Sequence, residues 1–296
     1  MSRTQKPMSF ETALKSFIGY LEGSGKSFNT ITNYRLDLLG FRNFLIQQSS
    51  QKKKKPIQLQ GIEPKDLLRF HDDLVRRGQK ANTRRRKFLT VNKFFSYLVQ
   101  RKKLPLEFGK KVPSPQKIER VPVTVSTQHL LQVIEALPRV ALLEARNRLL
   151  LWILAETGAQ VTEVAQLRFD DFTAEKNSIG GWVQILGKGE RKVPVSHELR
   201  EEIQVMRRRS PKSPWLFTGF NRQGPLGGAI SARGVELVVK HYAPQFTDSK
   251  FTPRTLRHSV VLHWFEQGLS RAEIQARLGL KTAYAFRSYE PLLKAK

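Results

Sequence analysis

The sequence WVQILGKGERKVPV, at residues 182–195, is the one strand-like stretch in a chain whose other patterns are helical. Apolar and β-branched residues stand on both sides of the turn Gly187–Arg191. Two such runs joined by a short glycine-containing turn predict a β-hairpin, with Lys188 at its tip. The hairpin decides the fold class, because it makes a mainly α region into a mixed α/β domain with one small β-sheet.

Helical patterns surround this hairpin, from residue 126 to the end of the chain. Apolar residues recur there at the spacing of amphipathic helices. Residues 126–296 therefore form a second domain in our interpretation. The predicted helices cover Ser126–Leu137, Ala141–Thr157, Glu198–Arg208, Ile230–Tyr242, Thr255–Gly268, Arg271–Leu278 and Ala283–Leu293.

The residues before this domain have a different character. Residues 105–125 contain four prolines, mixed charge and no helical period, which predicts an interdomain linker. Residues 1–104 show four helical patterns, so the first domain is predicted to be a small helical bundle. The four patterns are Phe10–Glu22, a helix capped by Asn29 or Thr30, a helix between Pro64 and Gly78, and Asn82–Arg101.

The charge of the chain is strongly positive. Its 296 residues include 52 Lys and Arg against 25 Asp and Glu, which gives a net charge of +27. Met1–Val112 holds 25 Lys and Arg against 8 Asp and Glu, a net charge of +17. This excess predicts a polyanion as the partner, with an acidic membrane surface as the alternative.

The composition excludes several classes of protein. The chain has no cysteine, which removes disulfide scaffolds, cysteine zinc sites and thiol nucleophiles, and its six histidines lack metal-ligand spacing. No run of about 18 apolar residues could span a bilayer, and Met1–Glu11 lacks the apolar stretch of a signal peptide. We therefore expect no metal site, no membrane partner and a cytoplasmic location.

Five short motifs together resemble a known family. The second domain carries TGAQVTEV at 157–164, the hairpin turn with Lys188, TPRTLRH at 252–258, and Leu-Gly-Leu at 278–280 followed nine positions later by Tyr289. The first domain carries Ser27-x-Asn29-Thr30-x3-Tyr34-x2-Asp37-Leu38-x2-Phe41. In this order they resemble the tyrosine recombinases, the phage-integrase and Xer-like family that cuts and rejoins DNA through a phosphotyrosine. The resemblance implies a helical, SAM-like core-binding domain before a catalytic-type domain.

The resemblance assigns a catalytic role to three residues. Tyr289 matches the nucleophile, Arg257 the second arginine, which grips the phosphate, and Lys188 the general acid. A phosphodiester can be cleaved without metal when a hydroxyl attacks in line, cations hold the non-bridging oxygens and an acid protonates the departing 5′-oxygen. The 3′-phosphotyrosine conserves the bond energy for religation, so neither ATP, Mg²⁺ nor another cofactor is implied.

Three other positions depart from the family pattern. Gln160 stands where the family has its first arginine, Arg254 where it has a histidine, and Leu280 where it has a histidine or tryptophan. Losing a charged contact to the phosphate slows such chemistry by about 10² to 10³-fold. Two hypotheses follow: an active enzyme for site-specific recombination or integration, whether or not these changes slow or impair it, or an inactive DNA-binding accessory or regulatory protein. Arg254 restores a positive charge one helical turn from Arg257.

The partners implied by the resemblance are double-stranded DNA and other recombinase subunits. Seven residues, Glu290–Lys296, follow Tyr289, fewer than relatives often use to dock on a neighbouring subunit. We therefore leave open a homotetramer on DNA and a partner recombinase that supplies a missing donor. Contact with the DNA backbone is predicted for basic residues of the first domain. They are Lys52, Lys53, Lys54, Lys55, Arg84, Arg85, Arg86, Lys87 and Lys93.

Each candidate also has a simpler interpretation. Tyr284 is a nearby competitor of Tyr289, and either is an ordinary aromatic of an amphipathic helix by spacing alone. Lys188 by itself is a solvated turn lysine, and the run Lys52–Lys55 a solvated loop. Arg257 could simply form an ion pair with Glu163.

Overall fold

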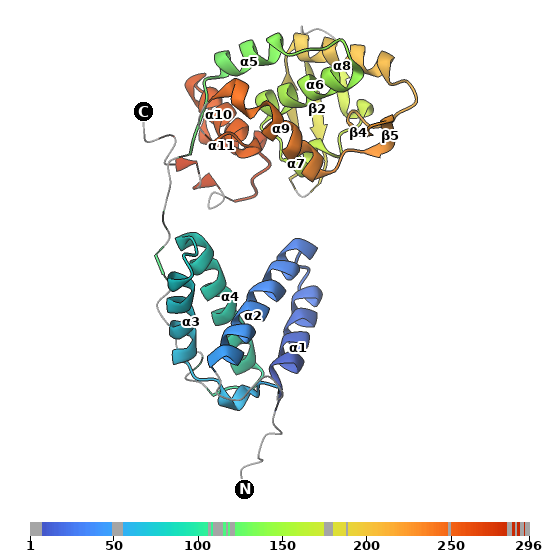
Figure 1. Cartoon of the computed structure of the whole chain (residues 1–296). Helices are drawn as coiled ribbons and strands as arrows, with labels where there is room; N and C mark the ends of the chain where they lie inside the picture. The colour runs from blue at the N-terminus through green and yellow to red at the C-terminus, as the bar shows by residue number, and fades with distance from the viewer. Residues whose placement is uncertain are drawn as a thin grey trace. The chain divides into compact units, whose positions relative to one another are not determined.

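The computed structural model of the chain forms two compact units, Met1–Glu119 and Arg120–Lys296 (Figure 1). Each unit has its own hydrophobic core. The structure describes residues 8–48, 56–105, 108, 115–116, 118, 122–174, 180–187, 189–247, 250–282, 286–287, 289–290 and 293.

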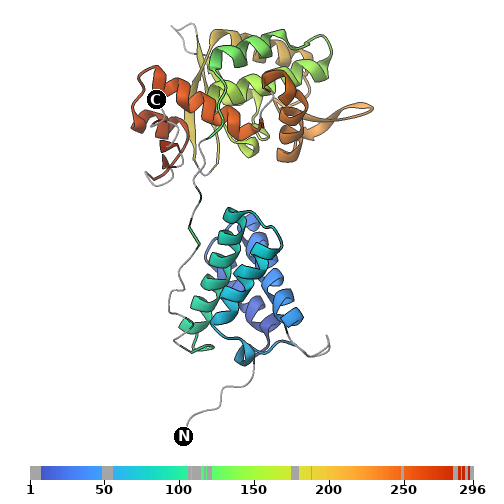
Figure 2. The same ribbon diagram turned by 60° about the vertical axis from the view of Figure 1, so that its left-hand side comes forward.

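The first unit is a helical bundle, seen from a second side in Figure 2. Its core is rich in phenylalanine, since Phe10, Phe17, Phe41 and Phe94 are fully buried and contact one another edge-on or tilted. Such aromatic pairs add roughly 0.5–1.5 kcal/mol beyond the area that they bury. The elements are α1 (Phe10–Gly23), α2 (Phe28–Gln48), the 3-10 turn η1 (Leu59–Gly61), α3 (Lys65–Arg76) and α4 (Ala81–Gln100).

The start of α2 differs from the sequence prediction. The helix begins at Phe28, and the Ser27 hydroxyl accepts a hydrogen bond from the Thr30 backbone N–H at 3.3 Å. Ser27 therefore caps the helix, and the prediction of Asn29 or Thr30 as the cap is wrong. Both residues lie inside the first turn. The backbone N–H groups two and three residues after them are already bonded within the helix, so neither side chain has a free N–H to bind.

The second unit is built around one buried helix. Nearly every residue of α6 (Leu142–Thr157) is buried, so it packs against neighbours on all sides and not along one face. α5, α8 and α10 contact it, with α9 nearby. The surrounding helices are α5 (Thr127–Ala136), α7 (Val161–Val164), α8 (His197–Arg209), α9 (Ala232–Phe246), α10 (Pro253–Glu266) and α11 (Arg271–Arg277).

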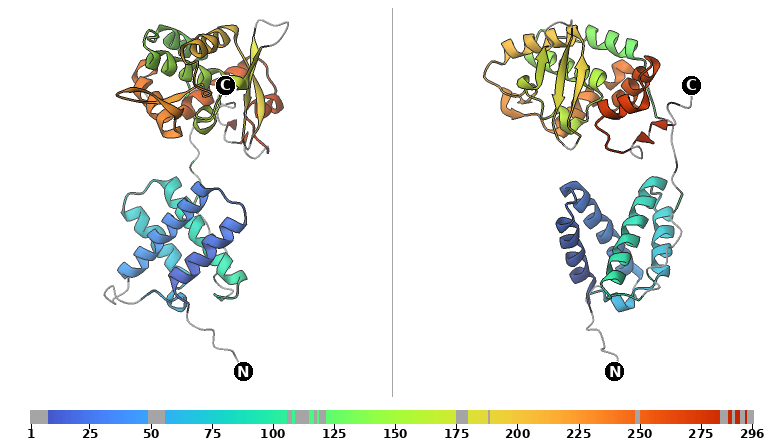
Figure 3. Two further views of the ribbon diagram at one scale, coloured as in Figure 1. Left: turned by 90° about the vertical axis from the view of Figure 1, so that its right-hand side faces the viewer. Right: turned by 180° about the vertical axis from the view of Figure 1, so that it is seen from behind.

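The predicted hairpin is present as β2 (Gly181–Ile185) and β3 (Arg191–Val195), paired antiparallel with Ile185 opposite Arg191. β1 (Phe172–Ala174) pairs with the other edge of β2, and the right-hand view of Figure 3 shows these strands side by side. Alternate residues of β2 are buried, which is the pattern of a strand with one face on the core. Arg191, expected in the turn, is the buried first residue of β3.

The expectation of one sheet is wrong, because β4 (Thr218–Asn221) and β5 (Gly224–Ala229) form a second, two-stranded sheet. β5 contains three glycines and a proline and is mostly exposed, so it lacks the apolar alternation that marks a strand. The predicted fold class is nevertheless confirmed: both units are mainly helical, and the second carries small antiparallel sheets. In the part of the chain that the structure describes, no helix has the length and apolar character to cross a membrane.

Candidate functional site

A cavity of about 860 Å³ lies in the second unit, between the loop before α7, one side of α9, the start of α10 and the chain near Tyr289. We call it the α10 cavity. Five of the residues singled out by sequence line it: Gln160, Arg254, Arg257, Leu280 and Tyr289. Positions spread over 130 residues thus meet around one space. Lys188 lies outside the described residues.

Arg257 lies in the first turns of α10 and is 7% exposed. The helix starts at Pro253 because the preceding Thr252 caps it. The Thr252 hydroxyl accepts a hydrogen bond from the Thr255 N–H at 3.3 Å, and proline suits the first helical position. The guanidinium donates from Nε to the Tyr289 hydroxyl at 2.9 Å and from Nη2 to the Leu278 carbonyl at 2.9 Å. Its Nη1 donates to the Gly158 carbonyl.

These contacts hold Arg257 without cancelling its charge, since all three acceptors are neutral oxygens. A guanidinium has five N–H donors, so two remain after these three bonds. Gly158 is suited to its place because it ends α6 with a φ of +59°, and an added Cβ would lie 2.8 Å from Val260. Arg257 does not pair with Glu163, so that simpler interpretation is wrong.

Glu163 instead binds Arg191 at both carboxylate oxygens, at 2.7 and 2.9 Å. Both side chains are largely buried, and the Arg191 Nε donates to the Arg277 carbonyl at 2.7 Å. The sequence reasoning missed this pair. The partners are 28 positions apart, and the only sign of the pair in the sequence is the charged residue with which β3 begins.

The hairpin tip packs against the Leu-Gly-Leu motif. Gly279 has a φ of +65°, and an added Cβ would lie 2.5 Å from the Gly189 carbonyl and 2.9 Å from the Arg191 Nη1. Only glycine fits such a close approach at positive φ. Two motifs that are 90 residues apart in sequence are therefore joined by backbone contact, with Arg191 beside them.

Tyr289 is 6% exposed and belongs to the core of the second unit. Its hydroxyl accepts the hydrogen bond from Arg257, and its ring meets the His258 ring edge-on, with centroids 5.4 Å apart. A tyrosine held in this way has a fixed hydroxyl position at the wall of the cavity. Tyr284, its competitor by sequence, lies outside the described residues.

His258 and Arg254 form a second contact on α10. The Arg254 Nε donates to the His258 Nε2 at 3.2 Å. Burial, with smaller contributions from the neighbouring Arg254 and Arg257 charges, lowers the pKa of His258 to about 4. His258 is therefore neutral at pH 7, as an acceptor at Nε2 must be.

The other two substituted positions offer the cavity little charge. Gln160 is exposed and caps α7, its backbone N–H donating to the Glu163 carboxylate at 2.7 Å. Leu280 is half-buried against the core, and its polar groups are held through Gln275, whose side chain donates to the Leu280 carbonyl at 3.0 Å. The cationic groups on the cavity wall come from Arg254 and Arg257, together with Lys240 and Lys250.

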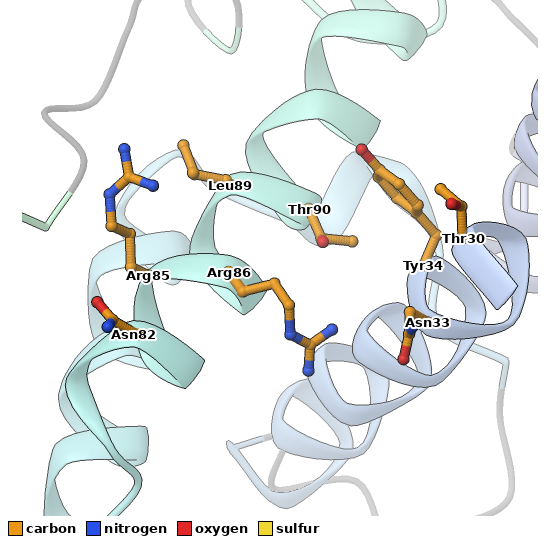
Figure 4. Close-up of a pocket in the computed structure, with 8 residues that line it drawn as sticks. All are labelled: Thr30, Asn33, Tyr34, Asn82, Arg85, Arg86, Leu89 and Thr90. Atoms are coloured by element: carbon orange, nitrogen blue, oxygen red, sulfur yellow. The ribbon is translucent and has the colours of Figure 1, made fainter. Parts of the chain in front are cut away.

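The first unit has a groove between α2 and α4, which we call the α2–α4 groove (Figure 4). Arg86 projects from α4 toward Asn33 on α2, whereas Arg85 points away from α2. The volume of the α2–α4 groove is about 500 Å³. The lining residues are Thr30, Asn33, Tyr34, Asn82, Arg85, Arg86, Leu89 and Thr90.

The Arg86 guanidinium forms an ion pair with Asp37, a residue of the first-domain motif that is 2% exposed. Thr90 also donates to this carboxylate, at 3.2 Å. Burial raises the pKa of Asp37 above its usual value, against the opposing effect of Arg86. At the groove edge the Lys93 ammonium lies 5.3 Å from the centroid of the Tyr34 ring.

The remaining predicted DNA contacts have mixed environments. Arg84 donates to the Gln79 carbonyl at 2.6 Å and Arg85 to the Pro115 carbonyl at 3.1 Å, so both are partly engaged within the unit. Lys87 is partly exposed on α4. The run Lys52–Lys55 lies outside the described residues. Among the residues that are described, no cluster of three or more histidine or carboxylate side chains could hold a metal ion.

Comparison with known proteins gives matches over both units. Residues 125–294 match the Phage integrase family, and residues 14–102 match the Phage integrase, N-terminal SAM-like domain. Tyrosine recombinase XerA of Pyrococcus furiosus is 28% identical over 272 residues, covering 90% of this chain and 84% of its own length. Tyrosine recombinase XerC of Chlamydia pneumoniae is 27% identical over 289 residues, covering 90% of each chain. The structure of the XerH site-specific recombinase bound to palindromic difH substrate matches in fold, with a TM-score of 0.73 and 20% identity over 97% of this chain and 83% of that one.

Proposed function

The chain belongs to the phage integrase family of tyrosine recombinases, and we propose from this membership that it binds double-stranded DNA, cleaves it through Tyr289 and rejoins it. The observation that carries the proposal is the hydrogen bond from Arg257 to the Tyr289 hydroxyl at the wall of the α10 cavity. One guanidinium contacts the nucleophile and keeps further donors for the phosphate beside it.

The chemistry follows from the placement of these groups. The Tyr289 hydroxyl releases its proton to solvent, and its oxygen attacks the phosphorus in line to form a 3′-phosphotyrosine while the bond to the 5′-oxygen breaks. The spare N–H groups of Arg257 hold a non-bridging oxygen, and their effect is large in a site that excludes water. We assign protonation of the departing 5′-oxygen to Lys188. Attack by a 5′-hydroxyl on the phosphotyrosine reverses these steps and rejoins the strand.

A second candidate function rests on Gln160 and Leu280. Neither side chain brings a charge to the cavity, and each missing donor is worth roughly 2–4 kcal/mol to such a reaction. The alternative is therefore a protein that binds DNA through the same fold but does not cut it, acting as an accessory or regulatory subunit. A partner recombinase on the same DNA would then supply the cleavage.

We propose that the first unit binds the DNA backbone. The α2–α4 groove carries Arg85 and Arg86, and Lys93 lies on the same helix near Tyr34. Basic residues beside polar Asn33 and Asn82 suit a surface that contacts phosphates mainly and base edges occasionally. Because bound phosphates release counterions, affinity should fall steeply with salt. We place this activity in the cytoplasm.

The test is covalent capture on a nicked DNA substrate whose cleaved end is lost, so that the strand cannot be rejoined. Wild type is expected to give a slower band on a denaturing gel, and Tyr289→Phe to give none. Tyr20→Phe is the matched control, because Tyr20 lies on the surface of α1 and should leave the band unchanged. A wild type that binds the site tightly but yields no band would exclude autonomous cleavage and favour the accessory function.

A further inference from the structure

The first unit has a second groove, at the other end of α4 from the α2–α4 groove. We call it the α4-end groove, and its volume is about 1130 Å³. It lies between η1, the start of α3, the last turn of α4 and the chain that follows α4. Along α4, the nearest lining residues of the two grooves are Thr90 and Val99, nine residues or about 14 Å of helix apart. The two grooves are therefore separate surfaces of the first unit.

The α4-end groove has an apolar floor. Leu59, Ile62, Leu104 and Phe108 line it and belong to the buried core of the first unit. Val99 also lines it, is half-buried and packs against this core. An apolar side chain that enters the groove would remove apolar surface from water on both partners, whereas a phosphate finds no donor on such a surface. The floor therefore favours a ligand with an apolar side chain.

The rim of the α4-end groove is cationic. Lys65, Lys102 and Lys103 line it and are exposed. The one acidic lining residue is Glu63, so the net charge of the lining is +2, three minus one. Glu63 pairs with Lys65 at 2.6 Å and compensates that lysine. Such a rim attracts carboxylates, and it disfavours a second copy of this chain, whose net charge is +27.

Lys102 has a backbone conformation that favours glycine. Its φ is +53°, and no other residue except glycine has a positive φ in the described part of the chain. The Lys102 N–H donates to the Val99 carbonyl at 2.9 Å. The next N–H, of Lys103, donates to the Leu98 carbonyl at 2.8 Å, which completes a helix end of the glycine type. A glycine would end α4 with less strain, so the helix end alone does not explain a lysine, whereas its place on the rim of the groove does.

We propose that the α4-end groove binds an acidic segment of a partner protein, with an apolar side chain of the segment on the floor and carboxylates at Lys102 and Lys103. Because the α2–α4 groove is a separate surface, DNA bound there leaves the α4-end groove open. Docking needs neither cleavage by Tyr289 nor the α10 cavity, so it is independent of the proposed function.

The first measurement is the affinity of the full chain for a labelled probe peptide, followed by fluorescence anisotropy at physiological salt. The probe is a short peptide of glutamates, with leucines at helical spacing. Wild type is expected to bind it with a Kd of about 10–100 μM, as suits a small interface. A peptide with serines in place of the leucines, and one with glutamines in place of the glutamates, should each bind at least about tenfold more weakly.

The second measurement compares variants of the rim with the same probe. Lys102→Gly should weaken binding about fivefold, because a charge is lost, and calorimetry should show a melting temperature of the first unit that is higher by a few degrees, because strain is relieved. Lost binding then has no origin in unfolding. Lys103→Ser should weaken binding to a similar extent. Lys15→Ser is the matched control, because Lys15 is exposed on α1 outside the groove, and it should bind within about twofold of wild type.

Several results would overturn the proposal. One is a probe that does not saturate wild type at millimolar concentration, and another is a serine or glutamine peptide that binds as tightly as the probe. Equal losses for Lys102→Gly and Lys15→Ser would reduce the effect to net charge. A larger loss of duplex DNA affinity in Lys102→Gly than in Lys15→Ser would make the rim a DNA contact instead. Sedimentation tests the remaining occupant, since a dimer of the free chain that Lys102→Gly abolishes would assign the groove to a second copy.

Discussion

The α2–α4 groove of the first unit and the α10 cavity of the second each centre on one arginine, and the two arginines are held differently. Arg86 is bound by the buried carboxylate of Asp37. Arg257 is bound by two carbonyl oxygens and the Tyr289 hydroxyl. Both arrangements fix a guanidinium, but only the carboxylate cancels its charge.

The difference teaches which cations this basic protein can direct at a single phosphate. When a charge is paired with an opposite charge, the two compensate each other, and the pair attracts a third charge only weakly. This holds particularly where burial lowers the dielectric constant and strengthens the pair. The charge of Arg191 is compensated by Glu163, as the charge of Arg86 is compensated by Asp37. Arg257 keeps a full positive charge at the cavity wall. Neutral acceptors therefore distinguish Arg257, the arginine that we propose to bind the attacked phosphate, from Arg86 and Arg191, which are paired with carboxylates.

The largest effect is expected where a buried carboxylate partner is removed. Glu163→Gln leaves Arg191 as an uncompensated charge in the second unit, so it should lower the free energy of unfolding by about 3–5 kcal/mol. Urea unfolding followed by tryptophan fluorescence measures this, because the four tryptophans (Trp152, Trp182, Trp215 and Trp264) all lie in the second unit.

Asp170→Asn is the control for this change. Its partner, Arg207, and Asp170 itself are both mostly exposed, so the loss should stay below about 0.5 kcal/mol. A loss of the same size for both variants would break the distinction between the structural pair and a surface pair.

The next largest loss of stability is expected when the backbone contact between Gly279 and Gly189, beside Arg191, is disturbed. Gly279→Ala places a Cβ against the Gly189 carbonyl and the Arg191 side chain at a φ of +65°, and should cost about 2–4 kcal/mol by the same unfolding measurement. Gly268→Ala is the matched control, because Gly268 also has a positive φ but no atom lies within 4 Å of its added Cβ. It should cost only the strain, about 1 kcal/mol. Equal losses would mean that the hairpin contact contributes nothing.

A smaller effect should appear in the pH dependence of stability. The pKa of His258 is about 4 in the folded protein and about 6.5 in the unfolded chain, so the unfolded state binds more protons between these values. Stability is then complete above about pH 6.5 and declines as the pH falls toward 4. The free energy of unfolding should drop by about 2 kcal/mol between pH 7 and pH 5, and His258→Asn should lack this part of the drop. An unchanged drop in the variant would contradict a neutral His258.

Most helices and the β2–β3 hairpin could be predicted because their signals are local, whereas the candidate site residues followed from the resemblance to the family. Apolar spacing gave the helices, and the turn at Lys188 gave the hairpin. The β4–β5 sheet was missed because glycines and a proline hide it, and the Ser27 cap because Asn29 and Thr30 compete for the role by residue type. Which oxygen holds which arginine depends on packing between distant segments. Pairing of Arg257 with Glu163, the simpler alternative from the sequence, is therefore wrong, because Glu163 pairs with Arg191.

The smallest effect concerns the groove of the first unit. Asp37→Asn keeps the shape of the side chain but removes its charge, so Arg86 would be held, like Arg257, by a neutral oxygen. Because burial raises the pKa of Asp37, its carboxylate is already costly to ionise, and the stability should change by no more than about 1 kcal/mol. The freed charge should tighten DNA binding several-fold and steepen the slope of log affinity against log salt by about 1. Asp72→Asn, an exposed change of equal charge on α3, is the control for net charge alone. If both variants shift the slope equally, the partner of Arg86 does not control its charge, and the rule drawn from the two arginines holds only for the α10 cavity.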